Sequence, residues 1–150
     1  MRNDPVNRWG VVGCLALVAL GACGSESGDQ DAAATQSAVP TAVIVSPTDG
    51  STFDGPAVQV DLGVENIALA AAGVNEPGTG HLHLFINHDL TPVGEVIPAG
   101  DGIVHLGKPQ SGFLMEGTAP GEYTIIAVLG DWAHVRLAEA RTDTVRIVVQ

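Results

Sequence analysis

The sequence contains five histidines among 150 residues, and four of them have a spacing that suits a metal site. His81 and His83 are two residues apart in an alternating stretch. Their side chains therefore leave the same face of a predicted strand, about 7 Å apart along the backbone, and can bind one ion at about 2.0–2.1 Å. His105 belongs to the next predicted strand and His134 follows a later one, and an antiparallel sandwich can bring both near the first pair. We therefore predict a metal site formed by these four residues.

The donor set indicates the metal. Three or four imidazoles without a thiolate suit Cu(II) or Zn(II), and the usual order of affinities places copper first. Asp131 lies three residues before His134 and can accept an imidazole N–H, which would fix the tautomer of a ligand. An aspartate directly after a glycine is equally typical of a turn, so both roles stay open.

Two further polar residues follow His105. Lys108 and Gln110 either line a small polar pocket beside the histidines or belong to an ordinary loop. His88 differs from these residues, because it follows the end of the predicted strand that carries His81 and His83. If that strand continued, the side chain of His88 would point to the opposite face. We expect His88 to lie outside the site.

Other kinds of active site lack their residues in this sequence. No serine or cysteine of the mature chain has the context of a nucleophile elbow, and no glycine-rich stretch joins a strand to a helix to bind phosphate. No residue is an evident general base, so an enzyme with an open metal position ranks last and we expect no enzyme. The main alternative to metal binding is a non-catalytic module that binds a small molecule, a glycan or a protein partner with the same polar cluster.

Strands must position the histidines, because the hydrophobic pattern after residue 40 repeats every two residues nearly throughout. Strands are predicted at residues 41–46, 57–64, 80–87, 103–106, 113–116, 123–129 and 142–149. Turn residues separate them at the spacing of a sandwich. The predicted fold is an all-β, immunoglobulin-like antiparallel β-sandwich of about seven strands, with an open barrel as the second choice.

The same alternation predicts which side chains form the core. The predicted core residues are Val58, Val60, Leu62, Ile147 and Val149, with one of Ile125 and Ile126. Only residues 66–72 and 135–141 have a helical composition, and both segments are too short to alter the fold class. Residues 71–79 contain two glycines and a proline and are predicted to form a loop.

The N-terminal region has the features of a bacterial lipoprotein signal. A basic start precedes an apolar run over residues 9–20, which is long enough for a signal peptide and short for a transmembrane span. The run leads into Leu-Gly-Ala-Cys, a lipobox, which predicts lipid attachment at Cys23. Residues 1–22 are the predicted signal peptide, 23–40 a disordered tether and 41–150 the β-sandwich domain. We expect a lipid anchor in the cell envelope, on the periplasmic face of the outer membrane if the host is Gram-negative.

Cleavage before Cys23 would leave a strongly acidic chain. Four basic residues then stand against 16 acidic ones, a net charge of −12. This charge argues against nucleic-acid binding and against electrostatic docking on anionic lipid. Because Cys14 is removed and Cys23 carries lipid, no disulfide is expected. An envelope protein or a small-molecule ligand remains open as a partner.

Three segments around the histidines form a recognisable set. They are Thr-Gly-His-Leu-His-Leu-Phe-Ile-Asn at residues 79–87, Val-His-Leu-Gly-Lys-Pro-Gln-Ser at 104–111 and Val-Leu-Gly-Asp-Trp-Ala-His at 128–134. The set resembles a bacterial envelope family known as domain of unknown function 4399, over residues 55–149. That family tends to have a glycine followed by three histidines in the first segment, and here Leu82 replaces the middle one. The matching residues are His81, His83, His105, Gly107, Lys108, Gln110, Asp131 and His134. The resemblance supports the same site and implies no particular reaction.

Overall fold

The computed structural model describes residues 38–150. Within this range the chain forms strands, turns and loops, and none of the described residues is helical. The predicted signal peptide, Cys23 and the tether up to residue 37 lie outside the described residues, so the lipoprotein interpretation stays a prediction. The described part of the chain contains no helix with the length and apolar character that crossing a membrane requires.

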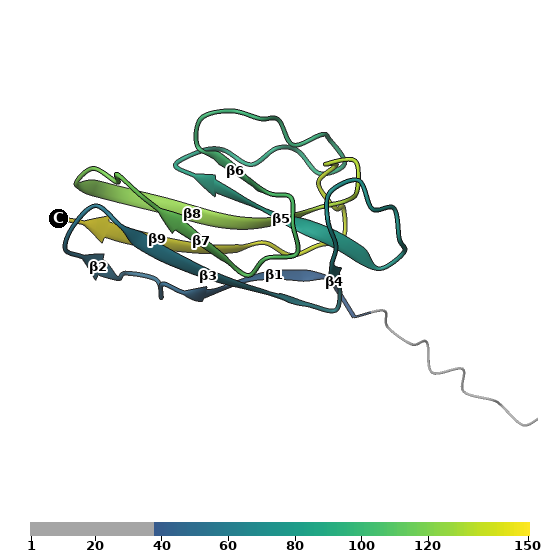
Figure 1. The fold of residues 1–150 in the computed structure, drawn as a ribbon, viewed down its shortest axis with the longest axis horizontal. Coiled ribbons are helices and arrows are strands. Elements are labelled where there is room, and N and C mark those ends of the chain that lie inside the picture. The colour runs from purple at the N-terminus through teal and green to yellow at the C-terminus, as the bar shows by residue number, and fades with distance from the viewer. Residues whose placement is uncertain (1–37) are drawn as a thin grey trace, which may run out of the picture. The chain divides into compact units, whose positions relative to one another are not determined.

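Nine strands between residues 38 and 150 form two sheets, which can be followed as two layers in Figure 1. The smaller sheet has the order β1-β3-β7 and consists of β1 (Thr41–Ser46), β3 (Val58–Glu65) and β7 (Gly112–Met115). The larger sheet has the order β2-β9-β8-β5-β4, and a further strand, β6, also pairs with β5. Its members are β2 (Thr52–Phe53), β4 (Ala68–Leu69), β5 (Thr79–Ile86), β6 (Ile103–Leu106), β8 (Gly121–Gly130) and β9 (Asp143–Val149).

The seven described strands of four or more residues match the predicted ones, and their ends differ from the prediction by at most two residues. One sheet of β1, β3 and β7 facing another with β5, β8 and β9 is the arrangement of an immunoglobulin-like sandwich, so the predicted fold class is confirmed. The two-residue strands β2 and β4 were not predicted, and they pair in parallel with β9 and β5. The larger sheet is therefore mixed. β4 lies within residues 66–72, where pairing with β5 overrides a helical composition.

The core between the sheets consists of the residues that the alternating pattern predicted. Each of those positions is at most 4% exposed, and Ile125 is the inward-pointing member of the isoleucine pair. Ile126 packs instead against a smaller cluster on the outer face of the larger sheet. Full burial of an aliphatic side chain of this size contributes about 1.5–3 kcal/mol. The core therefore supplies the rigid layer on which the histidines stand.

A tyrosine closes the corner before β8. The hydroxyl of Tyr123 donates a hydrogen bond to the carbonyl of Ala119 at 2.9 Å. A tyrosine near the start of this strand that bonds back to the preceding backbone is a recurrent feature of immunoglobulin-like domains. The contact fixes the entry of the longest strand, which ends next to the histidines.

Both faces of β5 are buried, so its histidines are shielded from water. Its leucines point into the core, whereas His81, His83 and Phe85 point to the outer face. There Phe85 packs against Val128 of β8 and Ile97, which belongs to the loop between β5 and β6. The loop and its neighbours therefore cover a face that would otherwise be open to water.

Candidate metal centre

Two strands and one turn position the four histidines. His81 and His83 stand on β5, and the antiparallel pairing of β5 with β6 places His83 directly opposite His105. Pairing with β8 places His81 opposite Gly130, the last residue of that strand. His134 follows in the turn after β8. Because residues that face each other across a ladder point to the same side of the sheet, His105 joins the first pair on the outer face.

A tight turn brings His134 to the cluster. Its backbone is left-handed, with a φ of +65°, which few residues other than glycine adopt. The carboxylate of Asp131 holds the turn, because Oδ1 accepts hydrogen bonds from the backbone N–H of Ala133 and of Val135, both at 2.8 Å. The N–H of Ile97 donates to the carbonyl of His134 at 2.8 Å. The turn is therefore tied to the loop that covers β5.

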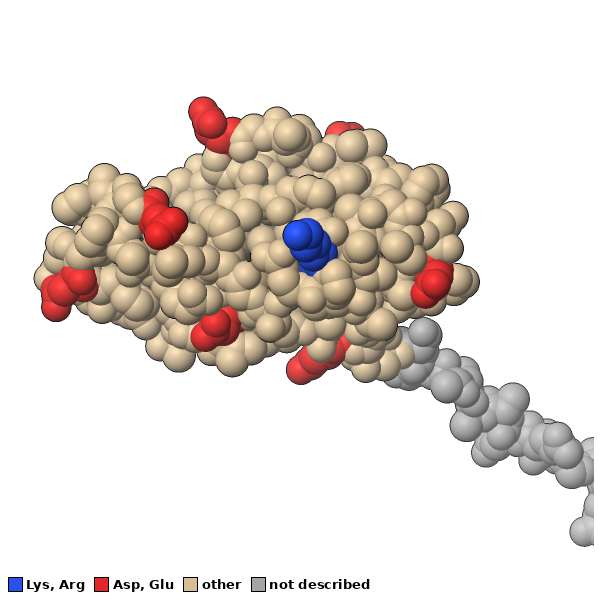
Figure 2. Space-filling view, viewed as in Figure 1, with Lys and Arg blue, Asp and Glu red and all other residues tan. Residues whose placement is uncertain are grey.

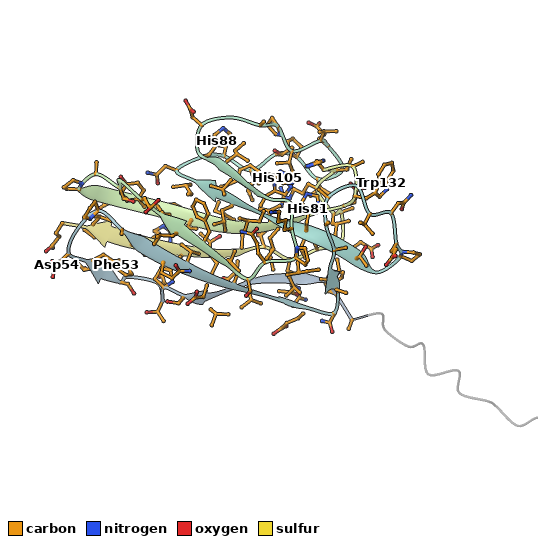
Figure 3. All side chains as sticks on the ribbon, in the orientation of Figure 1. Phe53, Asp54, His81, His88, His105 and Trp132 are labelled. Carbon is orange, nitrogen blue, oxygen red and sulfur yellow. The ribbon has the colours of Figure 1, made fainter. Side chains whose placement is uncertain are left out.

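The four rings form one cluster. The Nε2 atoms of His81 and His83 are 2.9 Å apart, and those of His105 and His134 are 3.1 Å apart. All six pairs of ring centroids lie between 4.6 and 5.8 Å. The ligand atoms of His81, His105 and His134 lie within 4.8 Å of one another, so this triad can hold a metal ion. Figure 3 shows His81 and His105 beside each other, with His88 nearer the top of the view, in the loop after β5.

Burial keeps the inner pair, His81 and His83, uncharged. The two residues are 1% and 2% exposed. Loss of hydration, followed by the charge of the neighbouring histidines, lowers the pKa of His81 from 6.5 to about 4 and that of His83 to about 3. The Asp131 carboxylate weakly opposes the shift in the pKa of His81. Burial and then the charge of His134 also lower the pKa of His105. At pH 7 the inner rings are therefore neutral, which is the form that binds metal ions.

The inner pair leaves ring nitrogens without a partner. The Nδ1 atoms of His81 and His83 are buried and have no hydrogen-bond partner among residues 38–150. When one Nε2–H donates to the other Nε2, the donor ring keeps an unused Nδ1 lone pair and the acceptor ring keeps an unused Nδ1–H. An unsatisfied buried polar atom costs about 1–3 kcal/mol. An ion bound at the two Nε2 atoms would leave an Nδ1–H on each ring, so the unpaired Nδ1 atoms are a cost of burying the pair.

The other polar residues that the sequence singled out make local contacts. Lys108 is exposed, and the amide of Gln110 donates to the carbonyl of Gly112 at 3.2 Å. The ring of His88 packs edge-on against Phe85, and its Nδ1–H donates to the next carbonyl at 2.7 Å. Asp131 adopts the turn role that the sequence left open. The predicted separation of His88 from the other four histidines agrees with the structure.

Sequence reasoning missed the loop that covers the inner pair. Residues 87–102 join β5 to β6, and Ile97 of this loop is 4% exposed. A Cβ atom placed on Gly130 would be 3.5 Å from Cδ1 of Ile97 and 3.1 Å from Nε2 of His83, so both side chains lie beside the end of β8. The available signal was the apolar Val-Ile-Pro at residues 96–98, inside a stretch rich in glycine, proline and acidic residues.

Comparison with known proteins assigns the chain through its folded region. No curated protein and no solved structure shows significant similarity to it. The family described as Domain of unknown function (DUF4399) matches residues 60–150, which is more than half of the chain and includes all four clustered histidines. The chain therefore belongs to the DUF4399 family.

Proposed function

We propose that this protein binds a transition-metal ion, Cu(II) or Zn(II), through the imidazoles of His81, His83, His105 and His134. One observation carries the proposal: four rings from three separate segments converge, and two of them are buried and neutral, which is the form of imidazole that binds metal ions. The Nε2 atoms of each pair face each other, so one ion between the rings could take up their lone pairs.

The donor set favours copper. Imidazole ligands without a thiolate suit Cu(II) and Zn(II), and Cu(II) is first in the general affinity order. We therefore place Cu(II) before Zn(II).

The proposed role is binding in the cell envelope, without catalysis. The lipobox at residues 20–23 supports a lipid anchor at Cys23, and the tether after it would let the sandwich extend from the membrane. The face seen in Figure 2 has acidic side chains scattered along its edges and little basic surface. This supports a protein that binds no nucleic acid, because such binding needs gathered positive charge.

Metal titration tests the proposal. Cu(II) and Zn(II) are titrated into wild type, His83→Ala and His88→Ala at pH 7, with binding followed by calorimetry. We expect His83→Ala to weaken binding by at least about tenfold, because it removes a buried donor, and His88→Ala to bind like wild type. Saturating ion should also raise the melting temperature of wild type, since the folded site binds and the unfolded chain mostly does not.

One result would refute the proposal, and another would change only the choice of metal. Equal, weak binding by all three proteins would show that the ion does not use the cluster. The histidines would then form a polar pocket for a small molecule, a glycan or a protein. Stronger binding of Zn(II) than of Cu(II), with the same dependence on His83, would keep the site and reverse the choice of metal.

A further inference from the structure

Gly107 lies directly under the ring of His105. The two residues are two positions apart, His105 within β6 and Gly107 directly after its last residue, so they share one face of the extended chain. A Cβ atom placed on Gly107 would be 2.5 Å from Cε1 and 2.7 Å from Nε2 of His105. Real Cβ atoms essentially never show contacts under 3.0 Å. The imidazole therefore occupies space that only glycine leaves empty.

Hydrogen bonds fix the backbone around Gly107, whereas the ring of His105 is free to move into solvent. The carbonyl of Gly107 accepts a hydrogen bond from the N–H of Ala72 at 3.1 Å, and His105 is locked in register opposite His83. The side chain of His105 is exposed to solvent. A methyl group at position 107 would therefore push the ring outward into water rather than move the strand. That movement would break the 3.1 Å approach of His105 to His134.

We propose that Gly107 is a positioning residue of the metal site, which acts by leaving room for the imidazole of His105 to fold back toward His134. This inference rests on the proposed function, because the ion is what the positioned ring would bind. Gly107 itself has no side chain to offer the ion. Its effect on binding therefore runs entirely through His105.

Gly130 gives a graded comparison on the opposite side of the cluster. A Cβ atom there would be 3.1 Å from Nε2 and 3.3 Å from Cδ2 of His83. These contacts are tight but require a shift of only a few tenths of an ångström. We therefore expect Gly130→Ala to have a smaller effect than Gly107→Ala. Gly100 provides the control, because it is exposed, has nothing within 4 Å of its Cβ position and is not left-handed.

The experiment is a double-mutant cycle with Cu(II) and Zn(II) titrated separately into the purified protein. The variants are Gly107→Ala, His105→Ala, the two together, and Gly100→Ala. We expect Gly107→Ala to weaken binding of the preferred ion by about 10–100-fold and Gly100→Ala to leave it unchanged. In the His105→Ala background, Gly107→Ala should produce no further loss, since two residues that act through one contact are not additive. The urea midpoint of the metal-free protein should stay at the wild-type value in Gly107→Ala.

A second readout follows the ring without any ion. In metal-free wild type and in Gly100→Ala, proton NMR should show a cross-relaxation peak between the rings of His105 and His134, and Gly107→Ala should lose it. Retention of that peak, wild-type affinity in Gly107→Ala, or a further loss in the double variant would each overturn the inference. Failure of wild type itself to bind either ion would instead refute the proposed function, so the two failures are distinguishable.

Discussion

Acid should destabilise the metal-free protein through the inner pair of histidines. His81 and His83 have pKa values of about 4 and about 3 in the folded chain, against 6.5 for an ordinary histidine. Well above pH 6.5 both rings are neutral in the folded and the unfolded state, so neither contributes to the pH dependence. As the pH falls below 6.5, both histidines bind protons in the unfolded chain but stay neutral in the folded chain. Stability is therefore lost with falling pH, and the loss levels off only near pH 4 for His81 and pH 3 for His83.

The size of the effect follows from the gap between the two states. Between pH 7 and pH 5 each ring should lower the free energy of unfolding by about 2 kcal/mol, and the pair by about 4 kcal/mol. This value hardly depends on the folded pKa, provided that it stays clearly below 5. A loss of about 4 kcal/mol is large compared with the free energy of unfolding of a whole domain, which is typically about 5–15 kcal/mol. It should be visible in an ordinary denaturation experiment.

The assay compares wild type, His83→Leu and His88→Ala by urea unfolding at pH 7, 6 and 5, with a chelator present. Leucine keeps an apolar group of similar size in the buried position but cannot take up a proton. Between pH 7 and pH 5 wild type should lose about 2 kcal/mol more than His83→Leu, and His88→Ala should follow wild type. Taking the difference between variants removes the contribution of the titrating groups that His83 does not contact. Equal losses in wild type and His83→Leu would refute the claim that His83 is held neutral by burial.

Two further predictions concern the core and the anchor. Ile125→Ala should lower the free energy of unfolding by about 2–4 kcal/mol at pH 7, because Ile125 is fully buried between the sheets, and a far-ultraviolet spectrum dominated by helix would contradict the sandwich itself. Cys23→Ser should abolish incorporation of labelled lipid and release the protein from the membrane fraction, and a variant that remains lipidated and membrane-bound would refute the lipobox interpretation.

The long strands were predictable because each buries one face over enough residues to show the period. Val58, Val60 and Leu62 alternate with polar neighbours, and the core contains all three. The two-residue strands β2 and β4 give no period to detect. Ala68 and Leu69 of β4 are good helix formers, and their strand conformation comes from pairing with Thr79 and Gly80. No local sequence pattern predicts which residues pair in this way.

The candidate site was predictable only in part, for a similar reason. Strand parity was enough to place His81 and His83 on one face. The pairing of His83 with His105 depends on strand register, and the approach of His134 depends on a left-handed turn closed by Asp131. Neither can be derived from residue type alone. The burial of the inner pair was also hidden, because it depends on segments that are distant in sequence, namely the rings of His105 and His134 and the loop residue Ile97, which packs on the same face.

The fold itself does not account for the inner histidines. Next to them on the same face, Phe85, Ile97 and Val128 form an apolar cluster that closes the sheet at no electrostatic cost. At His81 and His83 the chain instead buries two rings that leave ring nitrogens unpaired and that make the protein sensitive to acid. Apolar side chains there would give a more stable metal-free sandwich. The free energy of binding an ion to the neutral imidazoles would offset the cost of burying them. Because protons and the ion compete for the same rings, acid should lower both the metal occupancy and the stability of the fold.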